Sequence, residues 1–243
     1  MSTAPILIAA GGTGGHMFPA VSLANVLVAR GHSVIFATDP RGAAISTDVL
    51  GLESAVARHT ISSRSLSGGA KGIVAGLNAL LRGFLESRRL IRAQRPVIAV
   101  GFGGYPSVPP ILAAGLAGIP TVIHEQNALL GRANRRLARG ARAFALSFAQ
   151  TQRLKSAGQA RVSVVGNPVR ANIAALAARP YTPPSSVIDL FVVGGSQGAQ
   201  VFSKIVPDAF KVLTPPQRAR FRIAQQCRAE DIEAVRAIYA ELK

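Results

Sequence analysis

Cysteine, aromatic residues and acidic residues are all scarce in this chain of 243 residues. The single cysteine, Cys227, excludes an internal disulfide framework and fits a reducing compartment. Aromatic residues make up only 5% of the chain and no nucleic-acid recognition motif occurs, so we expect no nucleic-acid partner. No basic segment precedes the first apolar run, which stops at Gly11, so we expect no signal peptide and a cytoplasmic protein.

An uninterrupted apolar run is also lacking. No residue between Arg95 and His124 is charged, and this length alone would permit a membrane crossing. Prolines with intervening glycines interrupt the stretch, however, at Pro106, Pro109, Pro110 and Pro120. A helix exposed to lipid would leave backbone groups unsatisfied there. The sequence therefore predicts a buried strand, loop, helix and second strand rather than a membrane span.

Several familiar nucleotide-binding and metal-binding patterns are absent. No glycine-rich loop spells Gly-x-Gly-x-x-Gly, no Walker A lysine follows one, and no Asp-x-Asp pair occurs anywhere. A dinucleotide-dependent oxidoreductase stays open as an alternative, because Asp39 ends a predicted strand where an acid would take a ribose hydroxyl. The missing Asp-x-Asp pair is consistent with chemistry that needs no metal.

Positive charge is concentrated in the first three-quarters of the chain. Residues 1–180 hold 20 Lys and Arg against 5 Asp and Glu, a net charge of +15, whereas residues 181–243 hold 8 against 6. This asymmetry indicates an anionic partner on the N-terminal side, for which an anionic membrane surface or a phosphorylated lipid is the preferred interpretation. High arginine usage by the source genome is the alternative explanation.

Three glycine-rich loops, each directly after an apolar run, are the most informative feature present. They lie within residues 7–16, 97–105 and 190–199. A buried strand that breaks into glycines before a helix directs backbone N–H groups outward at a positive helix end, which is a site for phosphate or diphosphate. The first and third loops share the pattern Gly-Gly-(Thr/Ser)-x-Gly, which favours two successive doubly wound domains.

Short apolar runs alternate with helical stretches, as in a parallel sheet with crossover helices. The first helix is expected to begin near Phe18 and Pro19 and to end at Arg30. The proline-rich segment 181–186 predicts a linker between a domain at 1–180 and the start of a second at 187–243, with strands at 188–193 and 222–225 and a helix at 231–242. In the first domain the predicted strands cover residues 6–10, 34–37, 97–100, 121–123, 143–146 and 162–165.

Two short polar motifs complete the pattern. His-Glu-Gln-Asn at 124–127 follows a predicted strand, where ligands bind in α/β sheets, and Gly-Asn-Pro-Val-Arg at 166–170 follows the last one. Together with the three loops, in this order, these motifs resemble the family of bacterial enzymes that add N-acetylglucosamine to undecaprenyl-diphospho-muramoylpentapeptide, converting lipid I to lipid II. The resemblance runs from Ile6 to the end of the chain.

The resemblance implies an α/β protein of the GT-B type, with two doubly wound Rossmann-like domains of which the second is incomplete here. It implies an inverting, metal-independent hexosyltransferase of peptidoglycan biosynthesis, without a cofactor, peripheral to the cytoplasmic face of the inner membrane. The residues implied to contact the UDP-N-acetylglucosamine donor are Thr13, Gly14, Gly15, Asn127, Arg170 and Ser196. Those implied for the acceptor pyrophosphate pocket are Gly103, Gly104, Tyr105 and Gln126.

The general base has two candidates. His16 is favoured because an imidazole titrates near neutral pH and lies on the first loop, although it would equally serve to brace that loop. Glu125 is the second candidate, with an ion pair to Arg132 as its structural alternative. Because family members continue well beyond Lys243, the chain is expected to be truncated, and a second hypothesis makes it an acceptor- and membrane-binding half that needs a separate donor-binding partner.

A membrane-facing helix is also expected. Five apolar residues recur at helical spacing with arginines nearby, which suits an anionic interface, although part of this face must pack on the sheet. They are Leu77, Leu80, Leu81, Phe84 and Leu85, with Arg82, Arg88, Arg89 and Arg92.

Overall fold

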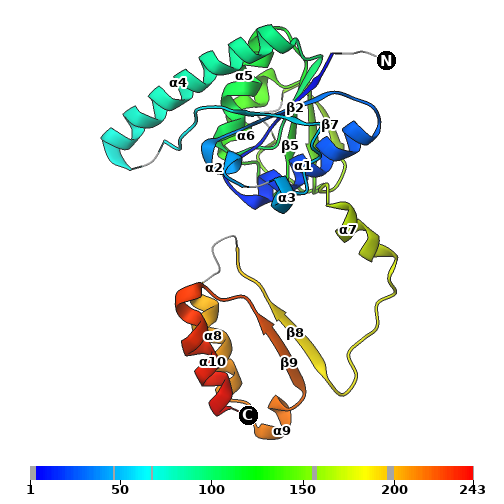
Figure 1. Cartoon of the computed structure of the whole chain (residues 1–243), viewed down its shortest axis with the longest axis vertical. Coiled ribbons are helices and arrows are strands. Elements are labelled where there is room, and N and C mark those ends of the chain that lie inside the picture. Colours follow the sequence, from blue (N-terminus) through cyan, green and yellow to red (C-terminus); the bar gives the residue numbers. More distant parts are fainter. Residues whose placement is uncertain (1–3, 46, 67, 155–157, 196–199, 243) are drawn as a thin grey trace. The chain divides into compact units, whose positions relative to one another are not determined.

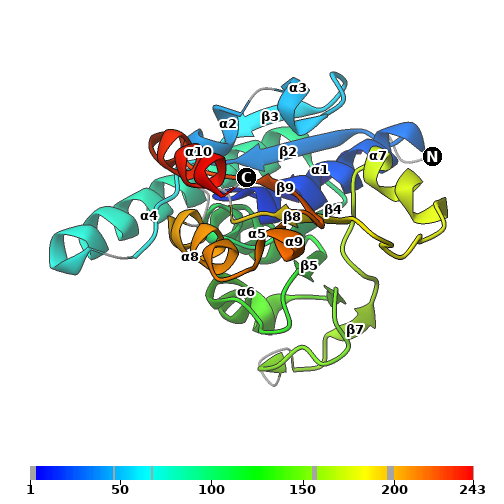
Figure 2. The ribbon, with the colours of Figure 1, turned by 90° about the horizontal axis from the view of Figure 1, so that it is seen from below.

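The computed structural model describes residues 4–45, 47–66, 68–154, 158–195 and 200–242. The chain divides into two compact units, Met1–Ala177 and Ala178–Lys243, which are drawn from two directions in Figures 1 and 2. The expected linker, residues 181–186, lies at the start of the second unit in an exposed segment without helix or strand.

A parallel seven-stranded sheet forms the first unit, in the order β3-β2-β1-β4-β5-β6-β7. Because β1 pairs with β2 on one side and with β4 on the other, the strand order reverses at β1, and α/β folds bind ligands at such points. The strands are β1 (Ile6–Ala9), β2 (Val34–Thr38), β3 (Ala57–Thr60), β4 (Ile98–Gly101), β5 (Thr121–Glu125), β6 (Ala143–Leu146) and β7 (Arg161–Val164).

Helices cover both faces of this sheet, as expected for parallel strands (Figure 1). The helices before β7 are α1 (Gly14–Ala29), α2 (Pro40–Ala43), α3 (Thr47–Leu50), α4 (Gly69–Gln94), α5 (Val108–Leu116) and α6 (Arg132–Leu137), with short 3₁₀ turns at Tyr105–Ser107 and Ala138–Gly140. After β7 come the exposed helix α7 (Ala171–Ala174) and a 3₁₀ turn at Ala175–Ala178, neither of which has a buried residue. Successive residues of β1 point to opposite faces: Leu7 joins the core beneath α4, α5 and α6, and Ile8 joins the core beneath α1.

Helix α1 begins four residues before the expected start near Phe18. Thr13 is extended, and its carbonyl accepts the N–H groups of His16 and Met17, so the helix follows the glycine loop directly. Pro19 therefore lies inside the helix, where it cannot donate to the carbonyl of Gly15. The expected end is confirmed, because Arg30 is the C-cap and Gly31 follows with φ +81°.

The sequence pattern located every strand of the first unit except β3. This edge strand reads Ala-Arg-His-Thr, so it has no apolar run to reveal it. Its pairing with β2 places Arg58 beside Phe36, at the margin of the sheet.

The second unit repeats the opening of the first on a smaller scale. Strands β8 (Ile188–Val192) and β9 (Phe221–Gln225) pair in parallel, with helices α8 (Gln200–Lys211), α9 (Pro215–Arg218) and α10 (Ile232–Glu241) and a 3₁₀ turn at Ala229–Asp231. Phe210 packs edge-on against Phe221 and Tyr239, with ring centroids 5.3 and 6.1 Å apart. The expected strands and last helix are confirmed to within a residue at each end.

Candidate active site

Four of the five motifs lie in the first unit, and all four follow the carboxyl ends of its strands. Loop 1 (residues 11–15) follows β1, loop 2 (residues 101–105) follows β4, residues 124–127 end β5, and residues 166–170 come after β7. Because the strands are parallel, these ends share one edge of the sheet, and β1, β4 and β5 are direct neighbours there. The fifth motif belongs to the second unit, and its Ser196 lies outside the described residues.

Loops 1 and 2 are packed against each other. A Cβ atom added to Gly11 would lie 2.7 Å from the ring of Pro106, and one added to Gly104 would lie 2.9 Å from the carbonyl oxygen of Gly11. Gly103 and Gly104 also have φ values of +86° and +73°, which L-residues rarely adopt. Glycine is therefore required where the two loops meet.

The N-terminus of α1 presents backbone donors at this edge. The N-cap residue, Thr13, makes no side-chain cap hydrogen bond, and the amides of Gly14 and Gly15 precede the first backbone hydrogen bonds of the helix, which begin at His16. These N–H groups lie at the positive end of a 16-residue helix. The geometry fits an anion such as a diphosphate.

His16 lies between loops 1 and 2. Its Nδ1 is 3.1 Å from the hydroxyl oxygen of Thr13, and its Cδ2 and Nε2 would lie 3.1 and 3.3 Å from a Cβ atom at Gly103. Burial lowers the pKa of His16 below its ordinary value of 6.5, and the negative charge of Glu125 opposes this shift in part. The imidazole is thus neutral near pH 7, as a general base must be.

Glu125, the second candidate base, is engaged by neighbouring protein groups. The residue is 1% exposed, and its carboxylate accepts the backbone N–H and the side-chain amide of Asn127, both at 3.0 Å. It also accepts the N–H of Gly131 and the amide of Asn134, both at 2.8 Å. With both oxygens engaged by neutral donors, Glu125 holds this segment together, and the ion pair expected with Arg132 is not what satisfies it.

His124 and Gln126 connect three segments of the site. The amide nitrogen of Gln126 donates to the carbonyl of Phe102 and lies 3.0 Å from Nδ1 of His124, whose Nε2 is 3.1 Å from the carbonyl of Gly166. The ring of His124 stacks on Phe102, with centroids 4.9 Å apart. Gln126 therefore holds loop 2 rather than extending freely into a pocket.

Arg170 lies against helix α1. Its guanidinium carbon is 4.5 Å from the centroid of the Phe18 ring on α1. It also lines a hollow on the flank of α1 with Ser22, Asn25 and Val26. Of the donor contacts that the resemblance implied, Thr13, Gly14, Gly15 and Asn127 gather at the sheet edge, whereas Arg170 packs alongside the helix.

Sequence reasoning assigned no site role to Asn134, and it named Asp39 only in the oxidoreductase alternative. Asn134 is buried on α6 and reaches both Glu125 and the carbonyl of His124. Asp39, which the oxidoreductase alternative requires for a ribose hydroxyl, is 1% exposed and accepts the N–H groups of Gly12 and Gly42. Its oxygens are occupied by protein donors, which argues against that alternative.

Neither a metal cluster nor a spanning helix is found in the part of the chain that the structure describes. Within it, no three His, Cys, Asp or Glu side chains gather closely enough to hold a metal ion. No helix there is both long and apolar enough to cross a membrane.

Known proteins similar to this chain carry one consistent description. It is 49% identical over its whole length to the UDP-N-acetylglucosamine--N-acetylmuramyl-(pentapeptide) pyrophosphoryl-undecaprenol N-acetylglucosamine transferase of Rhodospirillum centenum, and 47% identical to that of Rhodospirillum rubrum over 96% of its length. It covers 63% and 59% of these two proteins, so it spans about three-fifths of the curated relatives it matches.

Solved structures agree on the fold. The crystal structure of Acinetobacter baumannii MurG matches 98% of this chain with a TM-score of 0.69 and 28% identity, and 63% of that protein is covered. A UDP-glucosyltransferase from Polygonum tinctorium has the same fold at 17% identity, with a TM-score of 0.66 over 99% of this chain and 70% of its own. The expected α/β fold of the GT-B type is confirmed.

The family model described as the glycosyltransferase family 28 N-terminal domain matches residues 6–146, which hold β1 to β6 and both glycine loops of the first unit. This match covers more than half of the chain and includes His16, Glu125 and their partners. The chain belongs to glycosyltransferase family 28.

Proposed function

We propose that this chain acts in the transfer of N-acetylglucosamine from UDP-N-acetylglucosamine to the muramoyl 4-hydroxyl of undecaprenyl-diphospho-muramoylpentapeptide, which makes lipid II. The similar proteins from two Rhodospirillum species carry the name of this transferase. The observation that carries the proposal is the position of His16, a half-buried neutral imidazole between two glycine loops, with the first N–H groups of helix α1 beside it.

The proposed base is Nε2 of His16. For that nitrogen to accept a proton, Nδ1 must carry the other one and donate it to the Thr13 hydroxyl, 3.1 Å away. Nε2 then takes the proton of the acceptor hydroxyl, and the freed oxygen forms the new bond to the anomeric carbon from the face opposite UDP. The carbon–oxygen bond to UDP breaks, so the anomeric configuration inverts.

Charge in this transition state is compensated at both ends. The leaving diphosphate gains negative charge, which the N–H groups of Gly14 and Gly15 at the start of α1 stabilise without a metal. His16 gains positive charge, which the carboxylate of Glu125 stabilises because its field favours the protonated imidazole. Glu125 thus contributes as a positioning and electrostatic residue.

The remaining assignments follow the resemblance. Asn127, held by Glu125, is proposed to contact the donor together with Thr13, Arg170 and Ser196. Gly103, Gly104 and Tyr105 are proposed to surround the acceptor pyrophosphate, with Gln126 fixing loop 2 through the carbonyl of Phe102.

Binding to the anionic cytoplasmic face of the inner membrane is part of the proposal. Helix α4 carries a row of apolar side chains whose exposed fractions lie between 45% and 59%. Four arginines on the same helix, Arg82, Arg88, Arg89 and Arg92, are also exposed, as suits an anionic membrane surface. Phe84 packs on the core instead, as part of that face was expected to do. The exposed apolar residues are Ile73, Val74, Leu77, Leu81 and Leu85.

Sugar transfer by a completed protein tests this function. The chain is joined to the C-terminal remainder of the Rhodospirillum centenum relative and incubated with sugar-labelled UDP-N-acetylglucosamine and lipid I. We expect labelled lipid II with a β-linkage, formed in the presence of a metal chelator. A folded chimera that binds both substrates and transfers no label would contradict the proposal, as would an α-linked product.

A further inference from the structure

The four-residue helix α2 is fixed at both of its ends. Asp39 caps its start by accepting the N–H of Gly42 at 3.1 Å. At its other end a single nitrogen of Arg58, on edge strand β3, donates to the carbonyls of Gly42, Ala43 and Ile45 at 2.7 to 3.2 Å. The backbone that carries Arg41 is therefore held rigidly.

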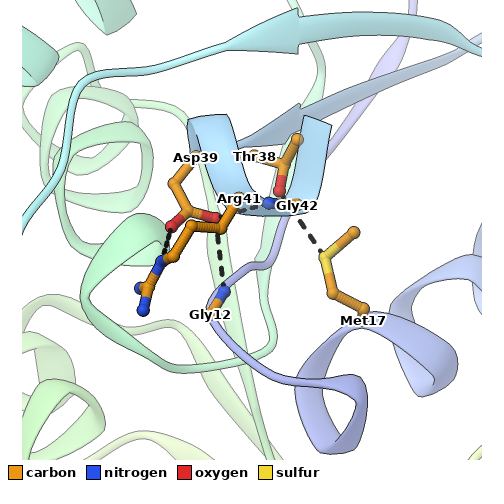
Figure 3. Close-up of polar contacts among 6 residues, drawn as sticks. All are labelled: Gly12, Met17, Thr38, Asp39, Arg41 and Gly42. Atoms are coloured by element: carbon orange, nitrogen blue, oxygen red, sulfur yellow. Dashed lines mark hydrogen bonds and ion pairs between the residues drawn. The ribbon is translucent and has the colours of Figure 1, made fainter. Parts of the chain in front are cut away.

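This turn is also attached to loop 1 and to the start of α1 (Figure 3). The carboxylate of Asp39 accepts the N–H of Gly12 at 3.3 Å. The hydroxyl of Thr38 donates to the sulfur of Met17 at 3.5 Å, and a Cβ atom at Gly42 would lie 3.3 Å from the terminal methyl of Met17. Helix α2, loop 1 and the first turn of α1 thus form one packed cluster.

Arg41 is exposed on the surface of this cluster. Its Nε donates to Asp39 at 2.9 Å, yet its side chain is 71% exposed while that of Asp39 is 2% exposed. One terminal nitrogen, Nη2, lies 3.7 Å from the Cβ position of Gly12, so the guanidinium is beside loop 1. Neither terminal nitrogen of Arg41 has a hydrogen-bond acceptor among the described residues.

We infer that Arg41 binds a phosphate oxygen of the diphosphate that loop 1 receives, and that Asp39 positions it for this contact. The inference deepens the proposed function and rests on it. An exposed ion pair by itself adds little to stability. A guanidinium held through Nε keeps its paired terminal N–H groups directed outward, which is the geometry that suits phosphate. The diphosphate can belong to the nucleotide sugar or to the lipid acceptor.

Calorimetric titration of the full chain tests this contact. Three probes are used at low salt: inorganic pyrophosphate, UDP-N-acetylglucosamine and farnesyl diphosphate. Arg41→Gln should weaken pyrophosphate binding about tenfold, and the loss should shrink at high salt because the contact is electrostatic. Arg41→Lys should recover part of the affinity, since it restores the charge but not the paired donors.

Arg30→Gln is the matched control. It removes the same charge from an exposed position at the other end of α1, about 24 Å away at 1.5 Å per residue. Its affinity for pyrophosphate should stay within about twofold of the wild-type value at moderate salt. Thermal midpoints of all variants establish that each remains folded.

The role of Asp39 is tested by a double-mutant cycle. If Asp39 acts through Arg41, Asp39→Asn should weaken pyrophosphate binding, and Asp39→Asn combined with Arg41→Gln should bind no more weakly than Arg41→Gln alone. A purely structural role would give additive losses and would overturn the positioning role.

The outcomes separate this inference from the proposed function. A loss of pyrophosphate affinity in Arg41→Gln that is accompanied by a loss for only one of UDP-N-acetylglucosamine and farnesyl diphosphate supports the contact and identifies its source. Wild-type affinity for pyrophosphate in folded Arg41→Gln overturns the contact and leaves the proposed sugar transfer standing. Arg41-dependent pyrophosphate binding by a protein that transfers no sugar would reject the proposed function and keep the contact.

Discussion

The amide nitrogen of Gln126 lies 3.0 Å from Nδ1 of His124 and also donates to the carbonyl of Phe102. Because the Phe102 carbonyl can only accept, it fixes the orientation of the amide, and Nδ1 of His124 must then accept. The proton of His124 is therefore on Nε2, which donates to the carbonyl of Gly166 at 3.1 Å. This neutral tautomer links loop 2 to the segment after β7.

Stability of the first unit should fall as the solution is acidified. Burial lowers the pKa of both His16 and His124 below 6.5, so between the folded and unfolded pKa values the unfolded chain binds more protons. The free energy of unfolding should hold above pH 7, decrease as the pH drops through 6.5, and level off below the folded pKa values. Urea unfolding at a series of pH values measures this.

Replacing His124 with asparagine should flatten that dependence, because one of the two depressed titrations is removed. The exposed His32, at the end of α1, gives the control: His32→Asn should leave the slope unchanged. A slope that is equally steep in His124→Asn would show that His124 does not contribute to it.

Glu125→Gln should shift the activity profile of the completed protein to lower pH. The carboxylate of Glu125 raises the pKa of His16, so its neutralisation lowers that pKa further and moves the acidic limb of kcat/KM downward. We also expect kcat to fall by about one to two orders of magnitude, because the imidazolium loses its stabilising charge.

His16→Ala is the companion variant, and it should reduce kcat by about a hundredfold or more while changing KM little. Were Glu125 the base, the acidic limb would vanish in Glu125→Gln and remain in His16→Ala. Rates measured from pH 5 to 9 distinguish the two assignments.

The exposed face of α4 should bind anionic vesicles. Binding in a sedimentation assay should rise with the fraction of anionic lipid and fall with salt, and replacing Arg88, Arg89 and Arg92 with glutamate should weaken it strongly. These side chains are exposed, so the thermal midpoint should change little. Equal binding to neutral and anionic vesicles would show that the excess positive charge does not serve to bind an anionic membrane.

Limited proteolysis should cleave between the two units. Residues 179–187 are exposed and contain no helix or strand, whereas β1 to β7 form a continuous sheet with its own core. Mass spectrometry should find a first cut at residues 180–186 and a stable basic fragment before it. A chain that resists cleavage throughout would contradict this arrangement.

Six strands of the first unit could be predicted because each is a short apolar run, and its two glycine loops because glycines follow β1 and β4 closely. Edge strand β3 was missed since its sequence, Ala-Arg-His-Thr, contains no apolar run, and Arg58 instead holds the end of α2. The roles of Asp39 and Glu125 depend on donors from distant segments, Gly12 and Asn134 among them. Local sequence patterns identify acidic residues at strand ends, but only the folded structure shows which protein groups donate hydrogen bonds to their carboxylates.

In the proposed mechanism the amides of loop 1 hold a diphosphate during sugar transfer, and a substitution at Gly15 tests this role. A side chain at Gly14 would meet the ring of Phe18 at 3.0 Å, whereas one at Gly15 meets only the Thr13 hydroxyl at 3.8 Å. Gly15→Val in the completed protein therefore blocks the diphosphate without crowding the fold. Gly115→Val, at an exposed α5 position with nothing within 4 Å, is the matched control.

Initial rates of lipid II formation by these two variants decide the matter. The account predicts a loss of about a hundredfold or more for Gly15→Val, near-wild-type rates for Gly115→Val, and thermal midpoints close to the wild-type value for both. A folded Gly15→Val protein that transfers sugar at the wild-type rate would contradict the account.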